Sequence, residues 1–85
     1  MSSRKYPPLT PTEVIRVLDA LGFVHKRTRG SHAQYEGFIN GQRRVVTVDE
    51  ARKEVDYNLL PEIIAQSGVG RDEFYNATKR TAKKI

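Results

Sequence analysis

The chain has 85 residues and no cysteine, and 38% of its residues are hydrophobic and 29% charged. A chain of this length forms one domain with a small core. The absence of cysteine excludes disulfides and thiolate metal ligands, and two isolated histidines do not make a zinc site. A net charge of +5 favours an anionic partner such as nucleic acid, and no apolar run approaches the ~18 residues of a membrane span, so we expect a cytoplasmic protein with no metal, no cofactor and no membrane contact.

The first helix is predicted from the segment LTPTEVIRVLDALGF, which follows a polar tail at residues 1–9. The tail lacks the apolar core of a signal peptide. Thr10 is the expected cap of the helix, Glu13 completes a capping box three residues later, and Gly22 ends the helix. An apolar stripe spaced three and four residues apart should face a sheet or another helix. Its members are Val14, Val17, Leu18 and Leu21.

Three strands are predicted next, over residues 23–28, 32–39 and 42–48, with a loop at 29–31. The Asn-Gly pair at residues 40 and 41 is a strong signal for a two-residue hairpin turn. It sets a register in which Tyr35 opposes Val46 and His32 opposes Asp49. One face is then apolar and should meet the helices, through Ala33, Tyr35, Val46 and Val48. The other face is polar and should stay open to water, with His32, Gln34, Glu36, Arg43 and Thr47. Similar sequences tend to carry an apolar residue at the position of His25, so we interpret this histidine of the first strand as partly buried and structural.

Two further helices are predicted after the charged loop DEARKEVDY. One spans residues 59–67, with Asn58 as its cap and Gly68 at its end, and it buries Leu60, Ile63 and Ile64. The other starts after Gly70 and is anchored by Phe74, and residues 77–85 are expected to fray. The order α-β-β-β-α with an additional C-terminal helix predicts one α+β domain over residues 1–85. Its architecture is that of a two-layer sandwich like the double-stranded-RNA-binding domain.

Three segments together resemble the HicA (YcfA-like) mRNA interferase toxins: LGFVHKRTRGSHAQYEG, RRVVTV and LLPEIIAQSGVGRDEF. The shared features are a Gly-Phe after the first helix, a Gly-Ser-His with an aromatic residue three positions on, and a short Ile-rich helix. The resemblance covers about residues 12–76. It implies a toxin that cleaves RNA, that a HicB-type antitoxin holds inactive, and in which His32 is catalytic. The chain departs from many relatives at Ala33, where they carry a second histidine, and it lacks their Val-Pro-x-His-like segment.

The chemistry of the histidine agrees with this implication. Metal-free RNA cleavage needs a base that takes the proton of a ribose 2′-OH, whose oxygen then attacks the adjacent phosphate, and a neutral imidazole suits this task near pH 7. Cations and a tight glycine turn can hold the phosphate. Asp49, opposite His32, can orient the imidazole, whereas Lys26, Tyr35 and water are equal candidates for the general acid. The candidate phosphate-binding residues are Lys26, Arg29, Gly30, Ser31, Arg43 and Arg44.

Less specific interpretations are also open. A histidine at the start of a strand is usually a polar surface residue, and arginines beside a hairpin turn commonly discourage aggregation at a sheet edge. The same fold can serve as a non-catalytic RNA-binding module that recognises shape and phosphates. It can also be a protein-interaction domain whose positive face docks an acidic partner. Tests for cleavage, for RNA binding at low salt and for the effect of removing His32 separate these classes.

Overall fold

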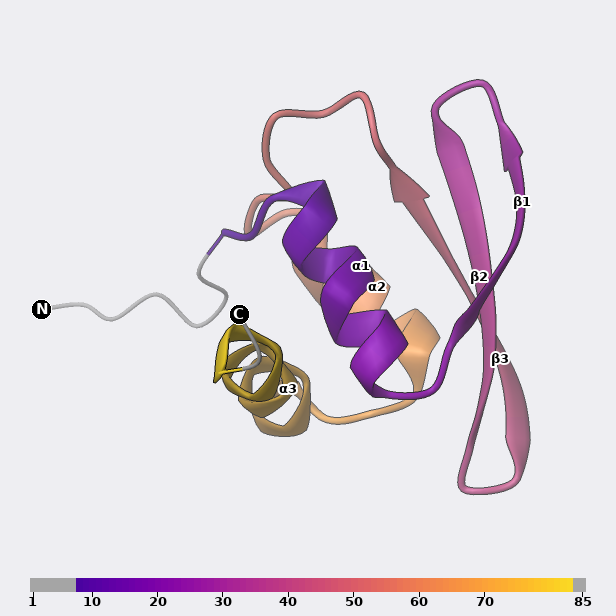
Figure 1. Cartoon of the computed structure of the whole chain (residues 1–85), viewed down its shortest axis with the longest axis vertical. Helices are drawn as coiled ribbons and strands as arrows, with labels where there is room; N and C mark the ends of the chain where they lie inside the picture. The colour runs from indigo at the N-terminus through magenta and orange to yellow at the C-terminus, as the bar shows by residue number, and fades with distance from the viewer. Residues whose placement is uncertain (1–7, 84–85) are drawn as a thin grey trace, which may run out of the picture.

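The computed structural model describes the backbone of residues 8–83 and the side chains of residues 8–77. One antiparallel sheet has the strand order β1-β2-β3, and the helices gather on one side of it (Figure 1). This arrangement confirms the α+β prediction and its resemblance to the double-stranded-RNA-binding fold, with one helix added at the C-terminus. The elements are α1 (Pro11–Ala20), β1 (Val24–Arg29), β2 (His32–Ile39), β3 (Gln42–Asp49), α2 (Leu60–Ser67) and α3 (Arg71–Lys83).

The β2–β3 hairpin has the predicted register. Asn40 and Gly41 adopt positive φ angles of 55° and 80°, the conformation that a type I′ turn requires. His32 pairs with Asp49, and every intervening pair down to Ile39 and Gln42 is in step. The predicted apolar face is buried under the helices, so that prediction is confirmed. Its buried members are Ala33, Tyr35, Val46 and Val48.

The core lies between this sheet face and the three helices. The predicted capping box of α1 is present, with Glu13 N donating to Thr10 Oγ1 at 3.1 Å and Thr10 N donating to Glu13 Oε1 at 2.8 Å. From α3, Phe74 and Ala77 are fully buried, and this helix packs mainly against α1. Ala77 itself is buried, the fraying over residues 77–85 stays a prediction, and residues 84–85 lie outside the described residues. Within residues 8–83, no helix combines the length and apolar character that crossing a bilayer demands.

The edge strand β1 differs from its prediction in three respects. It runs one residue later, so that only Gly30 and Ser31 form the turn into β2, with Gly30 at a φ of 61°. Its pairing with β2 is irregular between His25 and Arg27, which is the signature of a β-bulge. Every residue of β1 is exposed. His25 is thus not buried as expected, because the strand lies beyond the cover of the helices. Its Nε2 lies 2.7 Å from Thr28 Oγ1.

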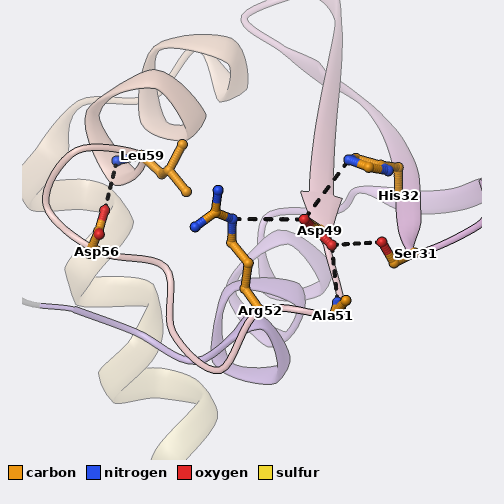
Figure 2. A network of polar contacts seen from close by, with 7 residues as sticks. All are labelled: Ser31, His32, Asp49, Ala51, Arg52, Asp56 and Leu59. Atoms are coloured by element: carbon orange, nitrogen blue, oxygen red, sulfur yellow. Dashed lines mark hydrogen bonds and ion pairs between the residues drawn. The ribbon is translucent and has the colours of Figure 1, made fainter.

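The start of α2 also differs from its prediction. Asn58 does not cap the helix; instead Asp56 Oδ1 accepts a hydrogen bond from the Asn58 backbone N–H at 3.0 Å. It also accepts one from the Leu59 backbone N–H at 3.3 Å (Figure 2). Asp56 takes this role because its short carboxylate can accept hydrogen bonds from the backbone amides that follow it in a local turn. Just upstream, Val55 is buried and exchanges two backbone hydrogen bonds with Leu9. Leu9, which we placed in the polar tail, therefore belongs to the fold, while residues 1–7 lie outside the described residues.

Candidate active site

The face of the sheet that points away from the core carries most of the predicted site residues. Alternation along β2 and β3 places His32, Gln34 and Glu36 on this open face together with Arg43, Thr47 and Asp49. Arg29 pairs directly with His32 and shares its face. The bulge in β1 puts two consecutive cations there, because Lys26 reaches Glu36 and Arg27 reaches Gln34. The open face is thus rich in positive charge.

His32 and Asp49 meet at one end of this face. The imidazole is 61% exposed, and its Nε2 lies 3.9 Å from Asp49 Oδ2. This distance suits an ion pair with a protonated ring but is too long for a hydrogen bond. The other oxygen, Oδ1, accepts from Ser31 Oγ at 2.8 Å and from the Ala51 N–H at 3.1 Å (Figure 2). The turn before β2 and the loop after β3 therefore hold the carboxylate beside the imidazole.

A groove with a volume of about 220 Å³ opens beside His32, between β3, the following loop and α2. Apolar side chains of the loop and of α2 form part of its lining, and polar side chains form the remainder. Arg52 enters from the loop, and its Nε lies 3.8 Å from Asp49 Oδ2. On the other wall, Gln66 Oε1 accepts from the Thr47 backbone N–H at 3.4 Å, which ties α2 to the edge of the sheet. The lining residues are His32, Thr47, Asp49, Arg52, Val55, Leu59, Glu62, Ile63 and Gln66.

A second hollow, of about 280 Å³, lies further along the open face. Glu36 is at its centre, with Lys26 Nζ 3.6 Å from its Oε1 and Arg43 Nε in contact with its Oε2. The hydrogen bond from Arg43 is the main reason that the pKa of Glu36 is lowered, and Lys26 acts in the same direction. Glu36 is four residues from His32 on one strand, which is about 13 Å. Lys26 and Arg43 therefore do not surround the imidazole, as the sequence suggested, but form a separate basic cluster.

Comparison with known proteins decides the family. The family model for the HicA toxin of bacterial toxin-antitoxin systems matches residues 11–69 of the chain. The chain belongs to the HicA toxin family. A search of curated proteins gives no match. Family membership confirms the resemblance seen in the sequence, and it implies a toxin that works with a HicB-type antitoxin. The matched residues include His32, Asp49 and the groove, whereas α3 lies beyond them.

Arg44 does not join the site of this HicA-family chain. It is opposite Gly37 on β2, on the side of the sheet that meets the helices, because neighbouring residues of a strand alternate between faces. Its side chain packs against Gly68 at the end of α2, where a guanidinium is favourable to the helix dipole. Its Nη2 donates to Gln42 Oε1 at 3.0 Å, and its Nε is buried without a partner among the described residues. We therefore interpret Arg44 as structural.

The buried face also removes a candidate general acid. Tyr35 is only 8% exposed and points towards the helices, so its hydroxyl is on the opposite side of the sheet from His32. Burial raises the pKa of Tyr35, and nearby carboxylates raise it further. Lys26 is held at Glu36, at the distant basic cluster. Of the three candidates from the sequence, this geometry favours water.

Removing the Ser31 hydroxyl should change the ionisation of Asp49. The hydrogen bond from Ser31 is the largest cause that lowers the pKa of Asp49, followed by the bond from Ala51. Because this pKa is lowered on folding, these contacts stabilise the fold above the usual aspartate pKa, and that stabilisation is lost as the pH falls through the folded-state value. In Ser31→Ala the pKa of Asp49 should rise towards its ordinary value, as followed by NMR titration of the carboxyl carbon.

Glu36 provides the internal control for this titration, because its lowered pKa has an independent cause in Arg43. The pKa of Glu36 should be the same in the parent and in Ser31→Ala. A Ser31→Thr variant, which keeps a hydroxyl, should behave as the parent does. An unchanged titration of Asp49 in Ser31→Ala would mean that the serine does not hold the carboxylate in solution.

Sequence reasoning missed the α2 side of the site. It identified Leu60, Ile63 and Ile64 as the buried stripe of α2 but did not consider the polar residues beside that stripe. Glu62 and Gln66 are four residues apart, so they project from one side of the helix, and this spacing was the available signal. In the described part of the chain, no group of three or more histidine, aspartate or glutamate residues is placed to hold a metal ion.

Proposed function

We propose that this member of the HicA family is a metal-independent endoribonuclease, which cleaves mRNA and is inhibited by a HicB-type antitoxin. The observation that carries the proposal is the position of His32. Its imidazole is largely exposed, it lies on the open, basic face of the sheet, and a groove begins beside it. A strand-opening histidine with only a structural role would not need a carboxylate fixed next to it by two further hydrogen bonds.

In the proposed reaction, His32 takes the proton from a ribose 2′-OH, and the oxygen attacks the adjacent phosphorus. The bond to the 5′-oxygen of the next nucleotide then breaks, and water supplies the proton to that leaving oxygen. Asp49 stabilises the imidazolium as it forms, because its Oδ2 is 3.9 Å from Nε2. Arg29, the cross-strand partner of His32, and Arg52, which reaches Asp49, would offset the charge that develops on the phosphate.

The remaining cations of the open face would bind the rest of the RNA. Arg27 lies between the two ends of the face, and Lys26 and Arg43 form the basic cluster about 13 Å from His32. Contacts of this kind hold a polynucleotide by its phosphates and place it in register without reading its sequence. The same charges would attract an acidic antitoxin surface, so a single face can be both the RNA site and the inhibited site.

The test of this proposal is cleavage of a short RNA by the purified protein. We expect cutting to persist in EDTA, and to stop when the nucleotide on the 5′ side of the cut carries a 2′-deoxy sugar, since the attacking oxygen is then missing. The control is the same substitution one nucleotide away, which should leave cutting intact. Cleavage of the 2′-deoxy substrate would rule out the mechanism. Tight, salt-sensitive RNA binding without any cutting would support the non-catalytic RNA-binding module instead.

A further inference from the structure

The groove beside His32 has the size and lining of a site for one flat ring. Its volume of about 220 Å³ is below the roughly 300–1,000 Å³ of pockets that hold drug-sized ligands. Ile63 from α2, Leu59 from the residue just before that helix and Val55 from the loop give it apolar surface on which a ring can lie. Because His32 is part of the same lining, a ring in the groove would belong to a nucleotide next to the cleaved phosphate. The inference therefore rests on the proposed function.

Two polar side chains on α2 give the groove a defined hydrogen-bonding character. Gln66 already uses its Oε1 to accept from the Thr47 N–H, so its amide NH₂ remains available to donate. Glu62 is exposed and makes no hydrogen bond or ion pair with any of the residues that the structure describes. The groove thus offers a carboxylate as acceptor and, one helical turn along, an amide as donor.

The carboxylate of Glu62 is informative because it lines the groove that opens beside the basic face of the sheet. A negative charge beside a phosphate-binding site weakens the binding of the RNA phosphate backbone. If RNA is the ligand, the carboxylate should therefore bind a different part of it. The N–H groups at the edge of a base are suitable partners, since hydrogen bonds to a charged acceptor are about twice as strong as neutral ones. Asp49 is less suited to this role, because its Oδ1 already accepts from Ser31 and Ala51 and its Oδ2 lies between His32 and Arg52.

We propose that the groove is a base-recognition subsite that selects guanine at the position next to the cleaved bond. Among the four bases, guanine alone has two neighbouring donors on its pairing edge, N1–H and the N2 amino group, and one carboxylate can accept from both. Its O6, next along that edge, would accept from the amide of Gln66. The ring would lie against Leu59 and Ile63. Adenine, cytosine and uracil each leave one carboxylate oxygen of Glu62 without such a partner.

Cleavage rates for RNAs that differ in one base test the subsite. Substrates carry guanine, inosine, adenine, cytosine or uracil at each position beside the cut, and kcat/KM is compared between the parent and Glu62→Gln. The parent should favour guanine by about 10- to 100-fold, the range that a good bidentate base contact gives. Inosine, which lacks the N2 amino group, should lose much of this preference. In Glu62→Gln the guanine and inosine substrates should become nearly equal.

Glu54→Gln is the matched control, because Glu54 is an exposed carboxylate of the loop that precedes α2 and does not line the groove. It makes the same change of charge and should keep the preference for guanine. A parent that cuts without preference at every position beside the bond overturns the subsite. So does an equal effect of the two substitutions.

A binding measurement separates the subsite from the nuclease activity. Guanosine monophosphate is titrated into the protein and the backbone amide signals of Leu59, Ile63 and Gln66 are followed by NMR, with adenosine monophosphate as the comparison. Selective shifts with the guanine nucleotide support the subsite even if no RNA is cut, in which case the proposed function alone fails. Equal shifts, or none, with both nucleotides overturn the subsite whatever the cleavage assay shows.

Discussion

Replacing His32 with alanine should lower RNA cleavage by about 10²–10⁴-fold, the usual contribution of a positioned general base. The loss should appear in kcat, because the cations that hold the RNA remain in place. Folding should be unaffected, since the imidazole is 61% exposed and fills no part of the core. The measurement is single-turnover cleavage of a labelled RNA, with binding of the uncut 2′-deoxy analogue measured in parallel.

His25 provides a matched control within the same chain. It is also an exposed histidine, but it pairs with Tyr35 on the outer strand β1 and does not line the groove. His25→Ala should cleave RNA at the parent rate. If both substitutions reduce cleavage to the same degree, or if His32→Ala retains full activity, His32 is not the base. Loss of RNA binding in His32→Ala would assign the histidine to substrate binding instead.

Replacing Phe74 with alanine should destabilise the fold by about 3–5 kcal/mol, the typical effect of removing a large aromatic ring from a core. Phe74 is fully buried and belongs to α3, which packs mainly against α1. Domains of this kind are stable by only ~5–15 kcal/mol, so this variant should be partly unfolded under mild conditions. Urea denaturation followed by circular dichroism gives the change in the free energy of unfolding.

Phe38 is the control for this experiment, because it is 66% exposed at the hairpin end of the open face. Phe38→Ala should change the free energy of unfolding by no more than about 0.5 kcal/mol. Equal effects at the two positions would mean that α3 is not part of the core in solution. The comparison bears on the family as well, because the matched residues end at Val69, before this helix begins.

The sheet was predictable because its signals are local. The Asn-Gly turn fixes the β2–β3 register, and the alternation of apolar residues then assigns each face. That register also placed Arg44 opposite Gly37, on the helix side, so the arginine could have been excluded from the site before the structure was known. The sequence analysis grouped Arg43 and Arg44 as phosphate-binding candidates because they are consecutive and basic. Residues that follow each other in a strand, however, point to opposite faces.

The remaining differences depend on tertiary geometry. Nothing in the segment around His25 shows that β1 extends beyond the helices, since that depends on where α1 and α2 lie on the sheet. The groove depends in the same way on how α2 docks against β3 through Gln66 and Thr47. The choice of Asp56 over Asn58 at the start of α2 is a competition between two short polar side chains, and the sequence contains no information that ranks them.

The exposure of β1 has a consequence for how the free toxin behaves at high concentration. An outer strand with a free row of backbone N–H and C=O groups is a template on which a second molecule can add its own strand. Here that border carries Lys26, Arg27 and Arg29, which repel the same border of another copy. The charges that would bind RNA therefore also oppose aggregation through strand pairing between molecules. Polyanions and high salt, which screen them, weaken this protection.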